Sequence, residues 1–394
     1  MPRLDRSADT TPVVVACRRT AIGRAHADRG VFRHVRGDEL AAAVIDAVVR
    51  QSGVDEATVE DVVFGATQQR GEQGGNVARC AALMAGLPFA AAGTAVNRLC
   101  GSSLQALAQA CHAIAAGAEN VQVVGGVEHM QHLPMESAID IHPRVFARSS
   151  RGMLSMGLTA EHLAAAHGIS RAKQEAFALD SHRKAAAAAD ACLFDDEIVA
   201  VTGHDEAGCV QEVTADQSIR RDTSPAAMAA LAPAFLPTIG TVTAATSAPV
   251  SDGAAALLVM SEAEARRQGL EPLVRVFGTA VVGVPPAVMG TGPIPAVRKL
   301  LNRVGLGLAD IDLVELNEAF AVQAIHCIET LGLDSAKVNV RGGALAIGHP
   351  LGASGARIAT TLIHAMRDTG ARLGMATMCI GMGQGIAVGF ERVE

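Results

Sequence analysis

Cys100, His349 and Cys379 are residues whose types could supply a nucleophile, a base and a second acid or base. Cys100 stands between Asn-Arg-Leu and Gly-Ser-Ser, directly before a helical pattern of apolar residues. The first turn of a helix has backbone N–H groups without partners and a positive dipole end, so a thiol there is expected to shift toward the nucleophilic thiolate. The small Gly101 and Ser102 let a substrate approach the backbone. The alternative is a buried structural cysteine, because free cysteine is among the most buried residue types.

The second half of the chain offers three further candidates. Asn317 opens Asn-Glu-Ala-Phe after an apolar run, His349 stands in Gly-His-Pro-Leu-Gly, and Cys379 opens Cys-Ile-Gly-Met-Gly-Gln-Gly. The glycine-rich segment around the histidine lacks the lysine of a P-loop and the spacing of a dinucleotide fingerprint. Taken singly, this histidine would be a loop residue and this cysteine a core residue. Together with Cys100 they form a set that suits covalent catalysis.

The composition limits the class of protein. The chain has 394 residues, 49% hydrophobic and 19% charged, which suits one large domain or two to three smaller ones with well-filled cores. Its net charge of −7 argues against nucleic acid as the main partner. The eight cysteines form no CxxC pair and no metal-ligand spacing, which favours reduced thiols and no metal site.

The sequence indicates no targeting signal. The first eleven residues are polar and lack the apolar core of a signal peptide, and no apolar run approaches the ~18 residues of a membrane span. The last residues, Glu-Arg-Val-Glu, are not a peroxisomal tripeptide. We therefore expect a cytoplasmic protein without a membrane span.

Apolar runs alternate with helical periodicity, which predicts an α/β protein with helices layered on sheets. Between residues 128 and 247 the pattern becomes polar and irregular, as in an insertion of about 120 residues that is longer than an ordinary connection. Helices are expected at residues 38–54, 76–85, 103–116, 159–166 and 170–189. Strands are expected at residues 12–17, 61–65, 94–99, 121–127, 251–261 and 273–282.

An internal repeat relates the two ends of the chain. Residues 48–64 align without gaps with residues 300–316 at an offset of 252, and each copy contains a helix, a Gly-apolar turn and a strand. A second match, at an offset of 251, places Gly-Ser-Ser at 101–103 over Gly-Ala-Ser at 352–354. Duplication therefore predicts two similar α/β halves whose loops meet at a shared site.

The stretches around Cys100, Asn317, His349 and Cys379 resemble the four signature blocks of the thiolases. The four blocks occur in the family's order over about 300 residues, which makes the match highly specific. The similarity runs over nearly the whole chain from Arg18. It implies a duplicated thiolase-like fold, with two halves of helix-covered mixed sheet in five αβαβα layers and a long loop-domain insertion.

The resemblance is greatest to 3-ketoacyl-CoA thiolase, the β subunit of the bacterial fatty-acid oxidation complex. This similarity depends on the Cys100 block, on Glu-His-Met followed by His-Leu-Pro-Met at 128–135, and on Thr-Ala-Glu at 159–161. Two departures argue against a short-chain biosynthetic member. Ala-Thr at 245–246 stands where many members have Gly-Asn or Gly-Thr, and Ser155 stands where biosynthetic members often have His.

The resemblance implies an acetyl-CoA C-acyltransferase that cleaves 3-ketoacyl-CoA with CoA in fatty-acid β-oxidation. Cys100 would attack the ketone carbon after His349 takes its proton, and acetyl-CoA would leave as an enolate that Cys379 protonates. CoA would then take the acyl group from Cys100. One oxyanion site would use His349 and a water held by Asn317, and the other would use the backbone N–H groups of Cys100 and Gly381.

The resemblance also implies that the insertion holds CoA, as a substrate and with no permanently bound cofactor. Ser247 matches a serine near pantetheine, and Arg220 matches a basic position near the nucleotide. Met156 and Met289 match methionines that line the acyl pocket. Without the resemblance, Arg220 would be a solvated charge and the methionines would be core residues.

The expected domains are an N-terminal half at 1–127 and 248–270, a CoA-binding loop domain at 128–247 and a C-terminal half at 271–394. The resemblance implies a homodimer or homotetramer, and a hydratase/dehydrogenase α subunit as a further partner. Three alternatives stay open: a biosynthetic acetoacetyl-CoA thiolase, a condensing ketoacyl synthase, and a non-catalytic lipid-binding or scaffold protein. Cys379 argues against the synthase, whose sites resemble a Cys-His-His set.

Overall fold

The computed structural model describes residues 7–135 and 139–393, so part of the polar N-terminal stretch, residues 136–138 of the predicted insertion and Glu394 lie outside the described ranges. The strands in these ranges are β1 (Pro12–Thr20), β2 (Gly23–Arg24), β3 (Asp61–Gly65), β4 (Thr94–Val96), β5 (Val121–His129), β6 (Ile198–Val199), β7 (Val201–His204), β8 (Val210–Val213), β9 (Ser251–Ser261), β10 (Val274–Gly283), β11 (Leu313–Leu316), β12 (Leu373–Ile380) and β13 (Gln384–Arg392). The α-helices are α1 (Gly37–Ser52), α2 (Val77–Met84), α3 (Ser102–Ala116), α4 (Met156–His167), α5 (Arg171–Asp190), α6 (Pro225–Ala229), α7 (Glu262–Gln268), α8 (Pro293–Val304), α9 (Ala321–Leu331), α10 (Ala344–Ile347) and α11 (Ser354–Thr369).

Apart from the edge strand β4, the two halves of the main sheet have the same strand order. The path of the sheet is β11-β12-β13-β10-β1-β9-β5-β3-β4, with β2 beside β9 and β6 beside β1. In each half, a parallel pair (β3 with β5, β11 with β12) is followed by two antiparallel pairs (β5-β9-β1 and β12-β13-β10). The halves meet at β1 and β10, where only Val13 and Val14 pair with Arg275 and Val274. The predicted duplication is thus visible in strand order and direction.

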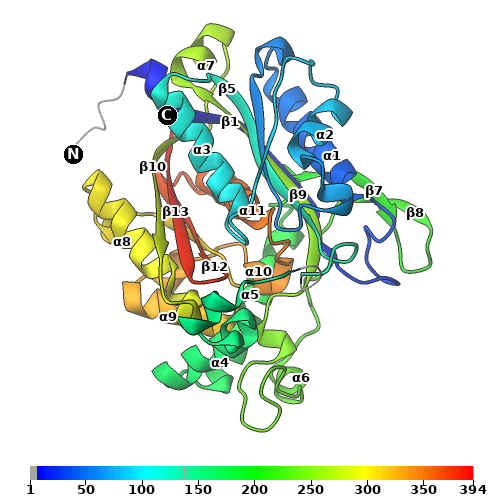
Figure 1. Cartoon of the computed structure of the whole chain (residues 1–394), viewed down its shortest axis with the longest axis vertical. Coiled ribbons are helices and arrows are strands. Elements are labelled where there is room, and N and C mark those ends of the chain that lie inside the picture. Colours follow the sequence, from blue (N-terminus) through cyan, green and yellow to red (C-terminus); the bar gives the residue numbers. More distant parts are fainter. Residues whose placement is uncertain (1–6, 136–138, 394) are drawn as a thin grey trace.

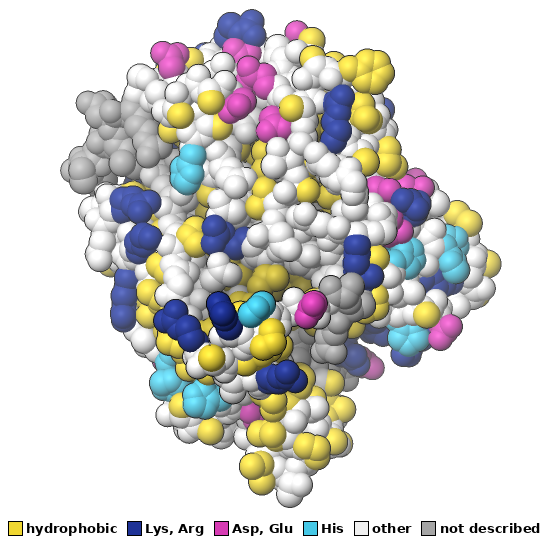
Figure 2. Space-filling model, viewed as in Figure 1, with side chains coloured by type: hydrophobic (Ala, Val, Ile, Leu, Met, Phe, Trp, Pro, Cys, Tyr) yellow, Lys and Arg dark blue, Asp and Glu magenta, His cyan; other side chains and the backbone are white. Residues whose placement is uncertain are grey.

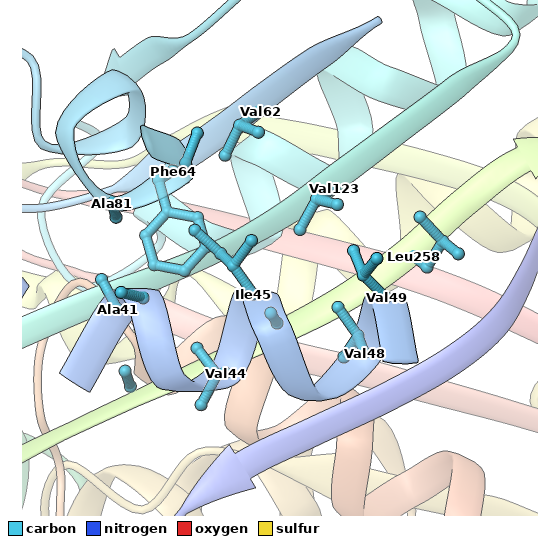
Figure 3. Packing of buried hydrophobic residues seen from close by; sticks show 14 of the residues in the cluster. Ala41, Val44, Ile45, Val48, Val49, Val62, Phe64, Ala81, Val123 and Leu258 are labelled. Atoms are coloured by element: carbon cyan, nitrogen blue, oxygen red, sulfur yellow. The ribbon is translucent and has the colours of Figure 1, made fainter. Parts of the chain in front are cut away.

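Helices form three layers around the two half-sheets (Figure 1). The α1 and α2 helices cover the outer face of the N-terminal half, and α8 and α9 cover that of the C-terminal half. The α3 and α11 helices lie between the halves and pack on strands of both. This is the expected αβαβα arrangement. Figure 3 shows the outer packing of the first half, where apolar α1 side chains face the strands: Ala41, Val44, Ile45, Val48 and Val49 against Val62, Phe64, Val123 and Leu258.

The two central helices cross at their N-terminal ends, close to Cys100 and His349. A Cβ atom on Gly355 of α11 would lie 2.5 Å from the backbone nitrogen of Leu104 in α3. The Ser103 hydroxyl also accepts the Ala356 backbone N–H at 2.8 Å. Only glycine permits so close an approach of backbone to backbone.

The repeat is reproduced at the level of single turns. Gly53 ends α1 and Gly305 ends α8, each with φ of 69° and at the predicted offset, since 305 − 53 = 252. A short 3₁₀ turn follows in both copies, at Glu56–Thr58 and Leu308–Asp310. The second match needs a correction of one residue: α3 begins at Ser102 and α11 at Ser354, an offset of 354 − 102 = 252 and not 251.

The long segment between β5 and β9 carries α4, α5 and α6 and the β7–β8 hairpin, and it lies at the lower and right side of Figure 1. The α4 and α5 helices pack against α9 of the C-terminal half. The β5 strand continues to His129, past the predicted boundary after residue 127. The division into three domains stays a prediction.

The surface shows charges of both signs. The face in Figure 2 has acidic side chains over its upper part and basic ones mainly over its left and lower parts, with apolar groups between them. Among the helices of the described ranges, none combines the length and hydropathy needed to cross a membrane. None of the eight cysteines, each within the described ranges, forms a disulfide.

Candidate active site

Cys100 lies in a tight turn between β4 and α3. The predicted strand at 94–99 ends early, at Val96, because the next residues form this turn. Leu99 has a left-handed backbone, with φ of 47°, a costly conformation for a leucine. The turn is held by the Leu99 N–H donating to Asn97 Oδ1 at 2.8 Å and by the Ser102 hydroxyl donating to the Leu99 carbonyl at 2.6 Å. This local strain places Cys100 at the N-terminal end of α3.

His349 lies in the loop before α11, and its ring orientation is fixed. Its Nδ1 is 2.6 Å from Ser354 Oγ, which itself donates to the Pro350 carbonyl at 2.8 Å. Since the hydroxyl has one hydrogen, Ser354 must accept from Nδ1–H, which leaves the Nε2 lone pair free to act as a base. The His349 backbone N–H donates to Ser251 Oγ at 3.1 Å.

Asn317 follows β11 and lies beside His349. Its amide nitrogen is 3.4–3.5 Å from the two ring nitrogens of His349. The side chain is fully buried, and its Oδ1 has no hydrogen-bond partner within the described residues. A buried, unpartnered amide oxygen is costly unless a ligand or water occupies it. The position therefore suits a residue that holds a small polar group next to the imidazole.

Cys379 and Gly381 come from the end of β12 and the turn into β13. Cys379 is 2% exposed. In this turn, Met382 and Gly383 have left-handed backbone conformations, with φ of 63° and 83°. The Gly381 backbone N–H faces the sulfur of Cys100 and lowers the pKa of that thiol. Cys379 lies close enough to Cys100 for a charge on the Cys100 sulfur to raise the pKa of Cys379.

A pocket of about 100 Å³ collects most of the predicted catalytic residues. Its polar wall contains Cys100, His349, Cys379 and Gly381. Asn317 contacts His349 from behind this wall. The rest of the lining is apolar: Met130, Met135, Met156, Ala248, Pro249, Val250, Met289, Ala319, Phe320 and Leu351.

A larger pocket of about 370 Å³ adjoins it, since both pockets are lined by Pro249 and Val250. Ser247 and Arg220 line this larger pocket, together with Arg24. Within the described residues, neither guanidinium forms an ion pair or a hydrogen bond. Burial lowers the pKa of Arg24, and repulsion by the Arg220 charge lowers it further. Two cations that face one cavity without carboxylates suit an anionic ligand.

Burial dominates the proton equilibria of the smaller pocket. It raises the pKa of Cys100 to about 11, in spite of the Gly381 N–H, and raises the pKa of Cys379 well above its ordinary value. Burial, with a contribution from the Arg357 guanidinium, lowers the pKa of His349 to about 3. The expected shift of Cys100 toward thiolate is therefore wrong, because desolvation outweighs the helix terminus. The resting pair is a thiol and a neutral imidazole, so the proton must move during the reaction.

Sequence reasoning missed several residues of these walls. Met130 and Met135 lie in residues 128–135, which the sequence analysis used only for the family resemblance. Nothing in the spacing of these methionines indicates a pocket. Ser354 stands five residues after His349, and only the turn geometry brings its hydroxyl to the ring. Arg24 lies in the two-residue strand β2, and nothing in its sequence context indicates a pocket.

Comparison with known proteins assigns nearly the whole chain to one family. Residues 12–263 match the model of the thiolase N-terminal domain, and residues 270–392 match that of the thiolase C-terminal domain. The chain therefore belongs to the thiolase family, a family of acyltransferases. It is 52% identical over 384 residues to the 3-ketoacyl-CoA thiolase of Aliivibrio fischeri, covering 96% of this chain and 99% of that protein. It is 51% identical over 385 residues to that of Shewanella frigidimarina, covering 97% and 99%.

Solved structures agree with this assignment. Human mitochondrial 3-ketoacyl-CoA thiolase superposes with a TM-score of 0.89 at 35% identity, and Bacillus anthracis acetyl-CoA acetyltransferase with a TM-score of 0.89 at 37% identity. Each comparison covers 97% of this chain and 99% of the other. Within the family, the similar curated proteins named above are 3-ketoacyl-CoA thiolases. The expected fold and family are thus confirmed.

Proposed function

We propose that the protein is a 3-ketoacyl-CoA thiolase, which uses CoA to cleave a 3-ketoacyl-CoA into acetyl-CoA and a shortened acyl-CoA. The observation that carries the proposal is the meeting of Cys100, His349 and Cys379 in the wall of one pocket. These residues come from distant parts of the chain and from both halves of the fold. A nucleophile, a base and a second acid on an apolar cavity suit cleavage of a carbon–carbon bond beside a ketone.

In the first step, the Cys100 sulfur adds to the ketone carbon while its proton passes to His349. A neutral imidazole is required for this transfer, and the lowered pKa of His349 keeps it neutral at ordinary pH. The resulting alkoxide collapses, the bond between the ketone carbon and the α-carbon breaks, and its electron pair becomes the enolate of acetyl-CoA. Cys379 then donates its thiol proton to the α-carbon of that enolate.

In the second step, the Cys379 thiolate takes the proton of an incoming CoA thiol. The CoA sulfur adds to the acyl-Cys100 carbonyl, Cys100 leaves as a thiolate, and His349 returns its proton to it. The Gly381 N–H, which faces the Cys100 sulfur, is placed to donate to an oxyanion on the acyl carbon. Losing one such donor typically costs ~3 kcal/mol of barrier stabilisation. The other oxyanion would bind His349 and a water held by the unpartnered oxygen of Asn317.

The larger pocket suits the remainder of CoA. Arg220 and Arg24 are placed to receive phosphates, and Ser247 lies in the wall toward the smaller pocket. Met156 and Met289 would contact the acyl group. The homodimer or homotetramer, the hydratase/dehydrogenase partner and the cytoplasmic location, all expected from the sequence, remain predictions.

The nucleophile can be tested by mass spectrometry. Intact protein mixed with a 3-ketoacyl-CoA should gain the mass of one acyl group, and Cys100→Ala should gain none. Cys80→Ala, which removes an exposed thiol, is the matched control and should keep the adduct. An undiminished adduct on Cys100→Ala would refute the assignment. Exclusive activity on acetoacetyl-CoA would instead favour a biosynthetic acetyltransferase.

A further inference from the structure

The smaller pocket has a second methionine wall that the reaction steps above do not use. Met156 and Met289 come from α4 and the turn before α8, whereas Met130 and Met135 come from the turn that follows β5. This turn, residues 130–135, lies at the start of the segment predicted as the loop domain. The cavity is therefore bounded by thioethers from the predicted loop domain and from the C-terminal half.

The turn is tied to its surroundings by many hydrogen bonds. The Gln131 N–H donates to Asp252 Oδ1 at 3.1 Å, and the Gln68 amide donates to the Met135 carbonyl at 3.2 Å. The Ser251 N–H donates to the sulfur of Met130 at 3.4 Å. Methionine is ordinarily a flexible side chain, so these contacts restrict a wall that would otherwise rearrange.

His132 is the central tie of the turn. Its Nε2 lies 3.0 Å from the Arg33 carbonyl, and its Nδ1 lies 3.0 Å from Glu72 Oε1. Both partners are acceptors, so both ring nitrogens are placed to donate, an arrangement that favours the protonated ring. Burial alone would lower the pKa of His132, but the Arg33 carbonyl and the Glu72 carboxylate raise it above its ordinary value. Glu72 also accepts the Gly37 N–H at 2.7 Å.

His129 stacks on His132, and its Nδ1 lies 3.4 Å from Asp252 Oδ1. Its Nε2 donates to the Phe32 carbonyl at 3.1 Å, and its Nδ1 accepts the His132 backbone N–H at 3.2 Å. The ring centroids are 3.8 Å apart and the planes differ by 13°. With Glu72 they could be taken for a metal site, since the ligand atoms lie within 4.8 Å of one another. However, the lone pairs of nearly parallel stacked rings cannot converge on one ion at ~2.0–2.1 Å.

We propose that Met130 and Met135 determine specificity for the acyl chain, and that His132 is the positioning residue that fixes their wall against Glu72 and the Arg33 carbonyl. This inference depends on the proposed function. The wall contacts the part of the acyl chain beyond the acetoacetyl unit, so the preferred substrates are 3-ketoacyl-CoA thioesters with an extended apolar chain. Each methylene buried against it contributes binding that acetoacetyl-CoA cannot gain.

The test measures kcat and KM of the full-length protein with acetoacetyl-CoA, 3-ketooctanoyl-CoA and 3-ketododecanoyl-CoA. In Met130→Ala and Met135→Ala, the ratio of kcat/KM for the longer substrates to that for acetoacetyl-CoA should fall by about 10-fold, the effect of a lost apolar contact. In His132→Gln, KM for the longer substrates should rise by about 5- to 10-fold with little change in kcat, because binding and not chemistry is affected.

The controls are Met84→Ala and His112→Gln, which alter exposed residues of α2 and α3 and should keep the wild-type ratio. The inference would be overturned if the wild-type protein cleaves these thioesters and all three variants keep or increase its ratio of kcat/KM for the longer substrates to that for acetoacetyl-CoA. This outcome would leave the proposed function intact. Wild-type protein that cleaves none of them would overturn the function itself. The inference would also be overturned if the protein binds one equivalent of zinc tightly and His132→Gln abolishes that binding. His132 would then be a metal ligand and not the donor of two hydrogen bonds.

Discussion

The hydroxyl of Ser354 lies 2.6 Å from Nδ1 of His349 and connects the base to the first turn of α11. The same hydroxyl donates to the Pro350 carbonyl, so the helix terminus, the loop and the ring form one rigid unit. This contact selects the tautomer whose Nε2 lone pair faces outward from Ser354. The active base is therefore set by a helix start that the duplication repeats at Ser102.

Ser354→Ala should lower kcat by about 10- to 100-fold, the range typical for losing a partner that orients a functional histidine. The KM for CoA should change little, because Ser354 is not part of the larger pocket. Stopped-flow measurement of acyl-enzyme formation checks this expectation. Ser103→Ala removes a buried hydroxyl from the same helix crossing without touching His349, so it should affect stability more than acylation. Equal rates in Ser354→Ala and wild type would contradict the assigned role.

The reactivity of Cys100 should keep rising at high pH. Burial raises its pKa to about 11, so the thiolate fraction at pH 7 is small and increases about 10-fold per pH unit up to that range. Iodoacetamide labelling of Cys100, followed by peptide mass spectrometry between pH 6 and pH 10, should show no plateau. A plateau above pH 7 would instead indicate a preformed thiolate–imidazolium pair. His349 stays neutral through this range because its pKa is lowered to about 3.

The fold could be predicted from the sequence because each element carries its own signal. The spacing of Val44 and Val48 predicts the α1 helix, and Gly53 predicts its end. The same pattern recurs in α8. The site could be predicted in part, since the helical pattern that follows Cys100 places this residue at a helix start. The partners of His349 could not, because the contact with Ser354 depends on an irregular loop.

The error on the Cys100 thiol has a physical cause. The helix terminus supplies a favourable field at the sulfur, but burial removes the water that would solvate a thiolate. That burial depends on distant residues such as Ile380, which packs against the neighbouring Gly101. The same limit applies to Met135, whose place in the pocket wall depends on ties to residues elsewhere in the chain.

The stability of the protein should fall between about pH 5 and pH 8 through Glu315. Burial raises the pKa of this β11 carboxyl to about 8, although Arg357 at 3.7 Å acts in the opposite direction. In this window the folded state holds a proton that the unfolded state has lost, so the free energy of unfolding decreases with pH by at most ~1.4 kcal/mol per unit. Glu315→Gln should remove this slope in urea titrations at several pH values, and the exposed Glu56→Gln should keep it. Identical slopes in wild type and Glu315→Gln would exclude the effect.

Gly348→Ala should abolish most activity. Gly348 has φ of 122°, and a Cβ atom there would lie 2.6 Å from Ser251 Oγ, the group that also accepts the His349 N–H. The substitution must shift the base, and the strained backbone should cost ~1–3 kcal/mol of unfolding free energy. Gly53→Ala is the matched control, because Gly53 also has a positive φ but has nothing within 4 Å of the added Cβ. It should lose stability and keep kcat, and comparable kcat losses in both variants would refute the argument.

Cys379→Ser should separate the two halves of the reaction. The serine hydroxyl is a much weaker acid than a thiol, so protonation of the acetyl-CoA enolate should slow by at least 10²-fold, the lower end for loss of a general acid. Transfer of an acyl group from Cys100 to CoA should slow less, because that step begins with the ionisable thiol of CoA itself. Enzyme acylated with an activated acyl thioester allows the second step to be timed alone, and 3-ketoacyl-CoA turnover reports the first. Cys327→Ser, a buried thiol outside the pocket wall, controls for the polar substitution. Equal slowing of both steps in Cys379→Ser would show that Cys379 does not act on the carbanion.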